Sequence, residues 1–150
     1  MNTQFNHPLE LTIESKQSLR LLANSGVVLG NQMVLLKGIN DNKYLVRLLN
    51  QELLSERVRP YYIFHAKNVC GTTHFRTPLD TGIKIIEYLG GNTSGLAIPT
   101  YIFSAPNGLG KIPLTPNYID SITEDRIYLH TWENQAISLD KTVYTLENEI

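Results

Sequence analysis

Residues 27–36 read Val-Val-Leu-Gly-Asn-Gln-Met-Val-Leu-Leu, an apolar run that only the polar Gly30-Asn31-Gln32 interrupts. Such a run predicts a buried strand. Asp41 then caps a predicted helix over residues 41–56, which carries leucines on one face. Residues 59–66 read as the next strand. This strand–helix–strand order predicts parallel strands joined by a right-handed crossover.

The alternation continues on both sides of this unit, without an internal repeat. Further elements are predicted in chain order: the tail of a strand at 3–7, a helix at 12–25, a helix at 79–89, a strand at 96–103 and a hairpin at 126–139 that turns at 133–135. Thr12 caps the first of these helices and Gly26 stops it, while Gly90-Gly91 ends the second.

The first of these strands has no element before it to cover its edge. Because an open parallel edge rarely faces water, the first half of a barrel is expected to be missing. We therefore predict an α/β fold: the C-terminal half of an incomplete parallel β/α (TIM-like) barrel over residues 1–120. A C-terminal β-hairpin extension and tail would occupy residues 121–150.

The composition argues against several classes of protein. A net charge of −1 over 150 residues argues against nucleic acid as the main partner. The one cysteine, Cys70, excludes an internal disulfide and a cysteine-rich zinc site, and it favours a reducing cytoplasm. No apolar run approaches the roughly 18 residues of a membrane span, so we expect a cytoplasmic protein without a membrane partner.

A short loop that contains two glycines ends at Lys111. Its sequence with flanking residues is Ser104-Ala105-Pro106-Asn107-Gly108-Leu109-Gly110-Lys111-Ile112-Pro113. Gly108 and Gly110 let the backbone pass close to a bulky group. Lys111 does not match a phosphate-binding loop, because Ala105 replaces a glycine of that motif and Ile112 replaces its Ser or Thr. Two interpretations remain: a lysine that forms an imine with a carbonyl cofactor such as pyridoxal phosphate, or a solvated loop charge.

Polar side chains follow several of the predicted strands. Gln32, Lys67 and Ser104 lie at or just beyond strand ends, and Lys111 comes a little later. In parallel α/β sheets, functional groups gather at the carboxyl ends of the strands. We therefore expect these four side chains to converge on one site.

Other polar residues near these strand ends have less specific interpretations. His65 and His74 come without a second set of ligands, which indicates hydrogen-bonded structural residues and no metal site. Arg76 is compatible with binding an anion and equally with stabilising its own turn.

Seven blocks of sequence resemble the lysine 2,3-aminomutase family. They are Asn6-His7-Pro8, residues 29–41, residues 57–62, His74-Phe75-Arg76-Thr77-Pro78, Thr93-Ser94-Gly95, Gly110-Lys111-Ile112-Pro113 and Pro116-Asn117-Tyr118. The blocks run in unbroken order over nearly the whole chain, yet they cover only the C-terminal half of a typical member. The resemblance implies an isomerase: a pyridoxal-phosphate and S-adenosylmethionine radical enzyme, on an incomplete β/α barrel, that moves an amino group from C2 to C3.

The same resemblance implies roles for individual residues. Lys111 would hold pyridoxal phosphate as an internal aldimine, on the loop that contains Gly108 and Gly110. Gln32 matches a position that lines the S-adenosylmethionine site, although a strand-end glutamine also commonly satisfies neighbouring backbone groups.

The substrate positions depart from the lysine-specific pattern. Lysine-specific members place two aspartates against the distal ammonium, and here the matching positions hold Lys67 and Ser104. Lys67 beside an ammonium would cost about 4 kcal/mol at 4 Å with an effective dielectric near 20. A cation and a hydroxyl suit a carboxylate, and members acting on glutamate carry lysine and an amide there. We therefore expect glutamate as substrate and β-glutamate as product, unless Lys67 turns to solvent or pairs with a nearby acid.

The family's [4Fe-4S] cluster needs three cysteines, which lie in its N-terminal half, whereas this chain has one. We therefore expect the chain to be inactive without that half, from the same gene or as a separate polypeptide, and we leave a homo-oligomer open. The alternatives are a noncatalytic or degenerate β/α module, or an aminomutase half that acts on lysine.

Overall fold

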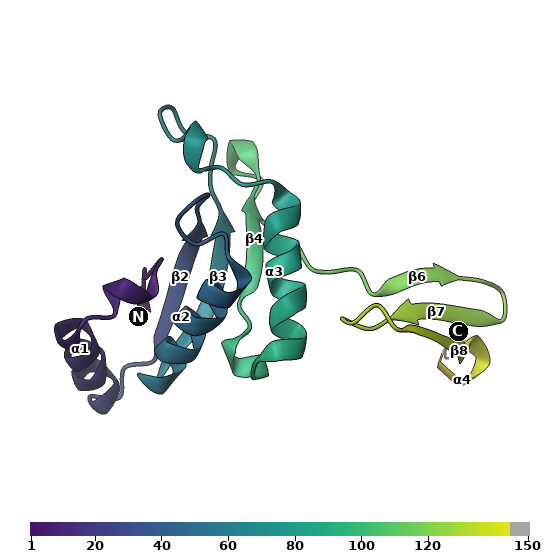
Figure 1. Cartoon of the computed structure of the whole chain (residues 1–150), viewed down its shortest axis with the longest axis horizontal. Helices are drawn as coiled ribbons and strands as arrows, with labels where there is room; N and C mark the ends of the chain where they lie inside the picture. Colours follow the sequence, from purple (N-terminus) through teal and green to yellow (C-terminus); the bar gives the residue numbers. More distant parts are fainter. Residues whose placement is uncertain (145–150) are drawn as a thin grey trace. The chain divides into compact units, whose positions relative to one another are not determined.

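The structure is a computed structural model that describes residues 1–144. The chain divides into two compact units, Met1–Thr115 and a second that begins at Pro116 (Figure 1). The first unit contains the parallel sheet and its helices, and the second contains a separate antiparallel sheet.

A five-stranded sheet forms the centre of the first unit, in the order β1-β2-β3-β4-β5. The strands are β1 (Asn2–Thr3), β2 (Leu29–Leu35), β3 (Val58–His65), β4 (Thr100–Ser104) and β5 (Lys111–Pro113). β1 to β4 pair in parallel with their neighbours, which confirms the predicted parallel sheet. β5 pairs antiparallel with β4 and was not predicted, because the chain turns back through the glycine-bearing loop.

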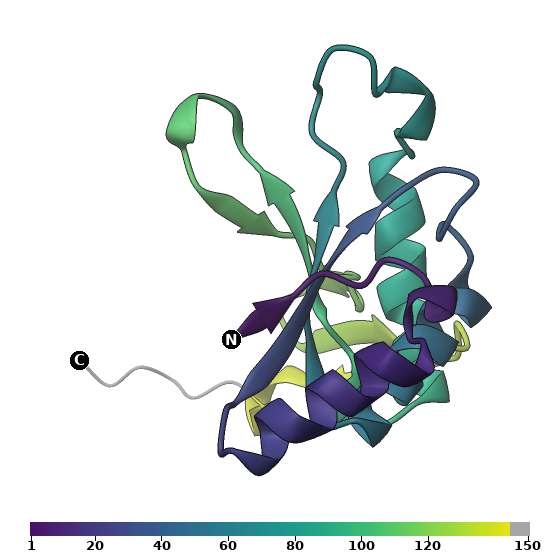
Figure 2. The same ribbon diagram turned by 90° about the vertical axis from the view of Figure 1, so that its left-hand side faces the viewer.

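The helices α1 (Ile13–Asn24), α2 (Lys43–Ser55) and α3 (Leu79–Asn92) lie on one side of this sheet (Figure 2). Alternate residues of β2, namely Leu29, Met33 and Leu35, join the buried core that all three helices share. The side chains between them, such as Gln32, point to the opposite face and are only half-buried. The first unit is therefore an open sheet with helices on one face, which by itself is not a closed barrel.

The polar Gly30-Asn31-Gln32 lies within the continuous strand β2, and the pairing with β3 shifts its register between Asn31 and Gln32. Asn31 is 2% exposed, and its amide both accepts from the Phe5 N–H at 2.7 Å and donates to the Phe5 carbonyl at 2.9 Å. A buried asparagine of this kind replaces the backbone pairing that β1 loses after Thr3. β1 is consequently shorter than the strand predicted at 3–7.

Three predicted boundaries were wrong for local reasons. The cap of α2 is Asn42, whose side chain accepts from the N–H groups of residues 44 and 45. α3 continues through Gly90-Gly91 to Asn92, whose amide donates to the Tyr88 carbonyl at 2.9 Å. β4 begins only at Thr100, because a short 3-10 helix, η3 (Gly95–Ala97), precedes it.

The second unit is a three-stranded antiparallel sheet of β6 (Ile119–Ile122), β7 (Arg126–His130) and β8 (Ala136–Asp140), followed by α4 (Lys141–Tyr144). The predicted hairpin is confirmed as β7 and β8, with Asn134 at φ 60° in its turn. β6 was not predicted, and it spans the boundary expected at residue 120, which stays a prediction. The end of the predicted tail lies outside the described residues.

Candidate functional site at the ends of β3 and β4

A cavity of about 780 Å³ opens at the carboxyl ends of β3 and β4. The loop after β3 and the loop between β4 and β5 extend from this same end of the sheet (Figure 2). The cavity is lined by His65, Ala66, Lys67, Asn68, Arg76, Phe103, Ser104, Ala105, Pro106, Asn107, Gly108, Gly110 and Lys111. It therefore brings together every predicted site residue except Gln32.

Lys111 begins β5 and lies opposite Ser104 of β4 in the antiparallel register. Its Nζ is 4.6 Å from the centroid of the Tyr62 ring and 5.2 Å from that of the Phe64 ring. Tyr62 pairs with Gln32, which is on the face of the sheet that the helices leave free. An ammonium over two aromatic faces gains a cation–π attraction, so the Lys111 amine lies against these rings while the residue remains exposed.

The loop before Lys111 depends on its glycines through backbone conformation. Asn107, Gly108 and Gly110 have φ values of 56°, 75° and 97°. The Ala105 N–H donates to the Gly110 carbonyl at 2.9 Å and closes the loop. A Cβ added at Gly108 or Gly110 would meet no atom within 4 Å, so no neighbouring described group excludes a side chain there. Glycine is favoured at these two positions because of their left-handed backbone conformation.

Lys67 and Ser104 face the cavity from two different strands. Lys67 lies just beyond β3 and is exposed, and Ser104 ends β4 and is half-buried. Within residues 1–144, the Lys67 ammonium makes no ion pair, which removes the interpretation that a nearby acid of this part neutralises it. Both groups remain available to a ligand as hydrogen-bond donors.

Gln32 does not line the cavity. Its position on β2 pairs with Tyr62, whose ring is the one below the Lys111 ammonium. Its side-chain amide makes no hydrogen bond to another described residue, so the interpretation that it satisfies neighbouring backbone is not supported there. Gln32 therefore shares a face of the sheet with Lys111 but is separate from the cavity.

His65 is fixed by a residue that sequence reasoning missed. Its Nδ1 lies 2.7 Å from the Tyr101 hydroxyl, and Tyr101 is 1% exposed. Burial raises the pKa of Tyr101 to about 12, while burial and then the Arg76 charge lower the pKa of His65. The contact between this imidazole and the Tyr101 hydroxyl gives the buried hydroxyl a partner and confirms His65 as hydrogen-bonded. Gly82, which leaves room for the Tyr101 ring, is the signal that could have identified this residue.

Metal binding finds no support in the described part of the chain. No group of three or more His, Cys, Asp or Glu side chains is placed there to hold a metal ion. Nor is any of its helices both long and apolar enough to span a bilayer.

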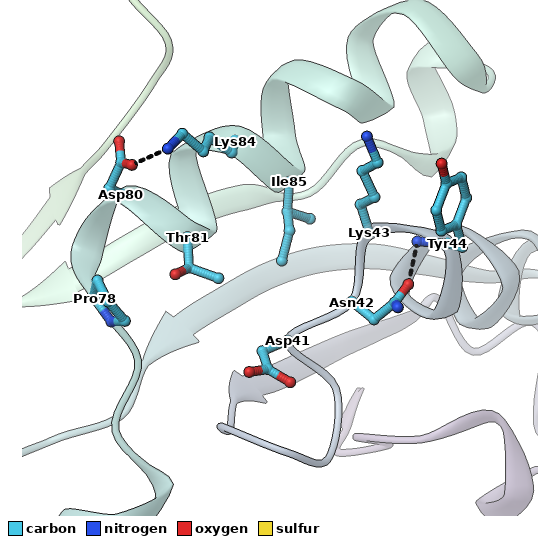
Figure 3. A pocket seen from close by; sticks show the side chains of 9 residues that line it. All are labelled: Asp41, Asn42, Lys43, Tyr44, Pro78, Asp80, Thr81, Lys84 and Ile85. Atoms are coloured by element: carbon cyan, nitrogen blue, oxygen red, sulfur yellow. Dashed lines mark hydrogen bonds and ion pairs between the residues drawn. The ribbon is translucent and has the colours of Figure 1, made fainter.

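A second pocket of about 480 Å³ lies at the N-terminal ends of α2 and α3 (Figure 3). Its charges are of both signs and are largely satisfied: Lys84 pairs with Asp80, and the Lys43 ammonium lies 4.6 Å from the Tyr88 ring centroid. Asn42 in this pocket caps α2. None of the predicted site residues lies here, so we assign the pocket no chemistry.

The fold and the cavity define an α/β protein with a lysine amine and further cationic side chains at the ends of parallel strands. A family model described as lysine-2,3-aminomutase matches residues 86–144. The glutamate 2,3-aminomutase of Clostridioides difficile is 57% identical over 140 residues, which are 93% of this chain and 33% of that protein. L-lysine 2,3-aminomutases of Methanococcus maripaludis and Acetoanaerobium sticklandii are 51% and 46% identical over 89% and 94% of the chain, or 31% and 34% of their own lengths.

The chain belongs to the lysine 2,3-aminomutase family and corresponds to the C-terminal part of its members. This confirms the resemblance found in the sequence. The chain spans about a third of the length of these relatives. The relatives are named as aminomutases, which are isomerases, and both glutamate and lysine occur among their substrates by name.

Proposed function

We propose that the chain is the C-terminal part of a pyridoxal-phosphate-dependent, radical S-adenosylmethionine 2,3-aminomutase that acts on glutamate. The observation that carries the proposal is one cavity that unites Lys111 with Lys67 and Ser104. Its volume of about 780 Å³ is within the range of small-molecule and cofactor sites.

The residues at the β4–β5 loop fit a phosphorylated aldehyde. Lys111 Nζ is the atom that would bond the cofactor, and the Tyr62 and Phe64 rings restrict where that amine lies. The left-handed turn at Gly108 and Gly110 presents the loop backbone to the same cavity. Bound there, pyridoxal phosphate supplies a conjugated system that stabilises a radical next to the migrating nitrogen. Gln32 would face S-adenosylmethionine from the same side of the sheet.

The charge of the cavity favours glutamate over lysine as substrate. Lys67 and Arg76 line it together with Lys111, and the lining residues that the structure describes include no carboxylate. A distal carboxylate would find charge-assisted donors here, whereas a distal ammonium would meet like charges. The relative named for glutamate, from C. difficile, is 57% identical to the chain.

The rest of the enzyme would come from the part of the relatives that this chain does not match. That part would supply the cluster cysteines, because the chain contains only Cys70. It would also cover the uncovered face of the sheet, so that the open sheet becomes part of an incomplete barrel.

Covalent attachment of the cofactor at Lys111 tests the proposal on the chain itself. The chain is incubated with pyridoxal phosphate and reduced with borohydride, and the modified lysine is mapped by peptide mass spectrometry. We expect labelling at Lys111, its loss in Lys111→Ala, and its retention in Lys37→Ala, a control on an exposed lysine outside both pockets. Labelling spread over surface lysines in proportion to exposure would contradict the proposal.

A further inference from the structure

Three aromatic side chains of β3 lie on the sheet face that the helices leave free, those of Tyr61, Tyr62 and Phe64. In a regular strand the adjacent Tyr61 and Tyr62 would point to opposite faces. The pairing with β2 skips one residue of β3, since Pro60 and Tyr62 pair with consecutive residues of β2. Tyr61 is the extra residue of this bulge, and both tyrosines therefore face the same side.

These three rings, which we call the aromatic row, contact one another. Tyr61 and Tyr62 stack with their ring centroids 3.8 Å apart, and the Tyr61 hydroxyl donates to the Tyr62 hydroxyl at 3.0 Å. Tyr62 meets Phe64 edge to face, with the centroids 5.4 Å apart. None of the three belongs to the buried core that the helices share. Packing of that core therefore does not account for the aromatic row.

The aromatic row contacts Lys111, whose Nζ lies 4.6 Å from the Tyr62 centroid and 5.2 Å from the Phe64 centroid. Lys111 is on β5, and β4 separates β5 from β3 in the sheet. The lysine side chain therefore extends across β4 to reach the rings. Within residues 1–144 the Lys111 ammonium makes no ion pair, so the two rings are the partners that the structure describes for its charge.

Contact with the rings restricts where the Lys111 amine lies. An exposed lysine ordinarily samples many side-chain conformations, whereas an amine that bonds one carbonyl reacts fastest when it is held next to it. The aromatic row favours conformations that keep Nζ at the sheet, beside the cavity that Lys111 lines. Lys67 lines the same cavity but has no such ring contact within the described residues. The geometry thus distinguishes Lys111 from the other lysine of the cavity.

We propose that Tyr62, supported by Phe64 and by its stacking on Tyr61, positions the Lys111 amine for bonding to the aldehyde of the cofactor. This inference rests on the proposed function and deepens it. In the bonding step, Nζ attacks the aldehyde carbon, a C=N bond forms, and the carbonyl oxygen leaves as water. Tyr62 is a positioning residue in this step, because its ring acts through Lys111.

Ring-current shifts of the Lys111 side chain test the contact without any cofactor. Protons above the face of an aromatic ring resonate upfield, so the Lys111 ε-protons should lie upfield of those of Lys67 and show NOEs to the Tyr62 ring. The chain is labelled with ¹³C-lysine, and the Lys111 signal is assigned by its absence in Lys111→Arg. We expect the upfield shift to remain in Tyr62→Phe, which keeps the ring, and to be lost in Tyr62→Leu.

The rate of cofactor attachment gives a second measurement. The chain is treated briefly with limiting pyridoxal phosphate and borohydride, and labelling at Lys111 is divided by labelling at Lys37, an exposed lysine outside the cavity. We expect this ratio to fall about two- to fivefold in Tyr62→Leu, the factor that a cation–π attraction at an exposed site supplies. Tyr62→Phe should retain the ratio of the parent.

Tyr44→Leu is the matched control, because Tyr44 is an exposed tyrosine whose ring centroid lies 5.3 Å from the Lys43 ammonium, outside the cavity that Lys111 lines. It should move the Lys43 signal and leave the Lys111 shift and the labelling ratio unchanged.

Two results would overturn the positioning role of Tyr62. One is a Lys111 signal that shows neither an upfield shift nor NOEs to Tyr62 in the parent chain, which needs no variant to fold. The other is a labelling ratio that is the same in Tyr62→Leu as in the parent. Absence of labelling at Lys111 in the parent would instead contradict the proposed function, so the two failures are distinguishable.

Discussion

At position 67, a lysine lines a cavity to which the described residues contribute cations and one hydroxyl, that of Ser104, but no carboxylate. If Lys67 and Ser104 bind the distal group of the substrate, the double variant Lys67→Asp with Ser104→Asp should reverse the substrate preference of the enzyme from glutamate to lysine. We expect the ratio of kcat/KM for the two substrates to change by at least about tenfold, since about 1.4 kcal/mol of differential binding is sufficient. The measurement compares both substrates in the reconstituted enzyme.

The control for this swap is Lys37→Asp, which makes the charge change of Lys67→Asp at an exposed position outside the cavity. The control should leave the ratio unchanged. An unchanged ratio in the double variant, with both proteins folded, would show that Lys67 and Ser104 do not select the substrate.

Single residues differ in how much of their role the sequence revealed. Lys67, Ser104 and Lys111 were predicted to converge because each follows a strand, and strand order alone brings such ends together. The prediction that Gln32 lies at a strand end was wrong, because Gln32 is in the middle of β2; it points to the open face of the sheet and lies outside the cavity. The interpretation of Arg76 stayed open because whether a guanidinium has a partner depends on residues distant in the sequence.

At the scale of elements, α3 contacts β4 through a glycine. A Cβ at Gly82 would overlap the ring of Tyr101, the residue that fixes His65. Gly82→Ala should therefore destabilise the chain by about 1–3 kcal/mol, as overpacking of a core usually does. Urea unfolding followed by circular dichroism measures this loss.

Gly95→Ala is the matched control, because a Cβ at Gly95 meets nothing within 4 Å and its φ is not in the left-handed region. It should unfold at nearly the same urea concentration as the parent. Equal stability of Gly82→Ala and Gly95→Ala would mean that Tyr101 moves aside without cost.

α1 is attached to the rest of the unit by apolar burial at Leu19 and by ion pairs to α2 and its C-cap residue. Arg20 donates two hydrogen bonds, at 2.6 and 2.8 Å, to Glu56, which is 4% exposed. The Arg20 hydrogen bond lowers the pKa of Glu56 below 4.5. The contribution of this carboxylate is therefore fully present above pH 4.5 and is lost as pH falls through the lowered value.

Glu56→Gln should accordingly lower the free energy of unfolding by about 1 kcal/mol at neutral pH, and the difference from the parent should vanish at acid pH. Urea titrations over a series of pH values measure it. Glu124→Gln, a change at an exposed carboxylate, should show no such pH-dependent difference. A Glu56→Gln deficit that persists unchanged in acid would contradict the ionic origin of the attachment.

The type of most elements and the parallel pairing of the strands followed from the sequence pattern, whereas the antiparallel pairings of β5 and β6 did not. The helices and parallel strands were predicted because apolar residues recur with the matching period over long segments. β5 is three residues long and contains Pro113, so on its own it reads as a loop, and only its pairing with β4 makes it a strand. β6 was missed for the same reason.

For the whole molecule, two surfaces lack cover within the described residues. The sheet face opposite the helices carries aromatic side chains, among which Tyr61 is 42% exposed. In the second unit no described residue is buried, and Trp132 is 42% exposed. The predicted half barrel stays a prediction, because the described residues form an open five-stranded sheet with helices on one face (Figure 2).

Exchange of this chain for the matching segment of the C. difficile glutamate 2,3-aminomutase tests whether that part completes it. The two proteins are 57% identical over the exchanged region, so the chimera is expected to fold and to convert glutamate to β-glutamate when its cofactors are supplied. The 150-residue chain alone should show no turnover, because one cysteine cannot hold the cluster. Product is measured by chromatography of the amino acids, and the chimera carrying Lys111→Ala serves as the inactive control.

A folded chimera that binds pyridoxal phosphate yet converts neither glutamate nor lysine would favour a noncatalytic module. A chimera that converts lysine alone would keep the aminomutase and reject the substrate assigned from Lys67 and Ser104.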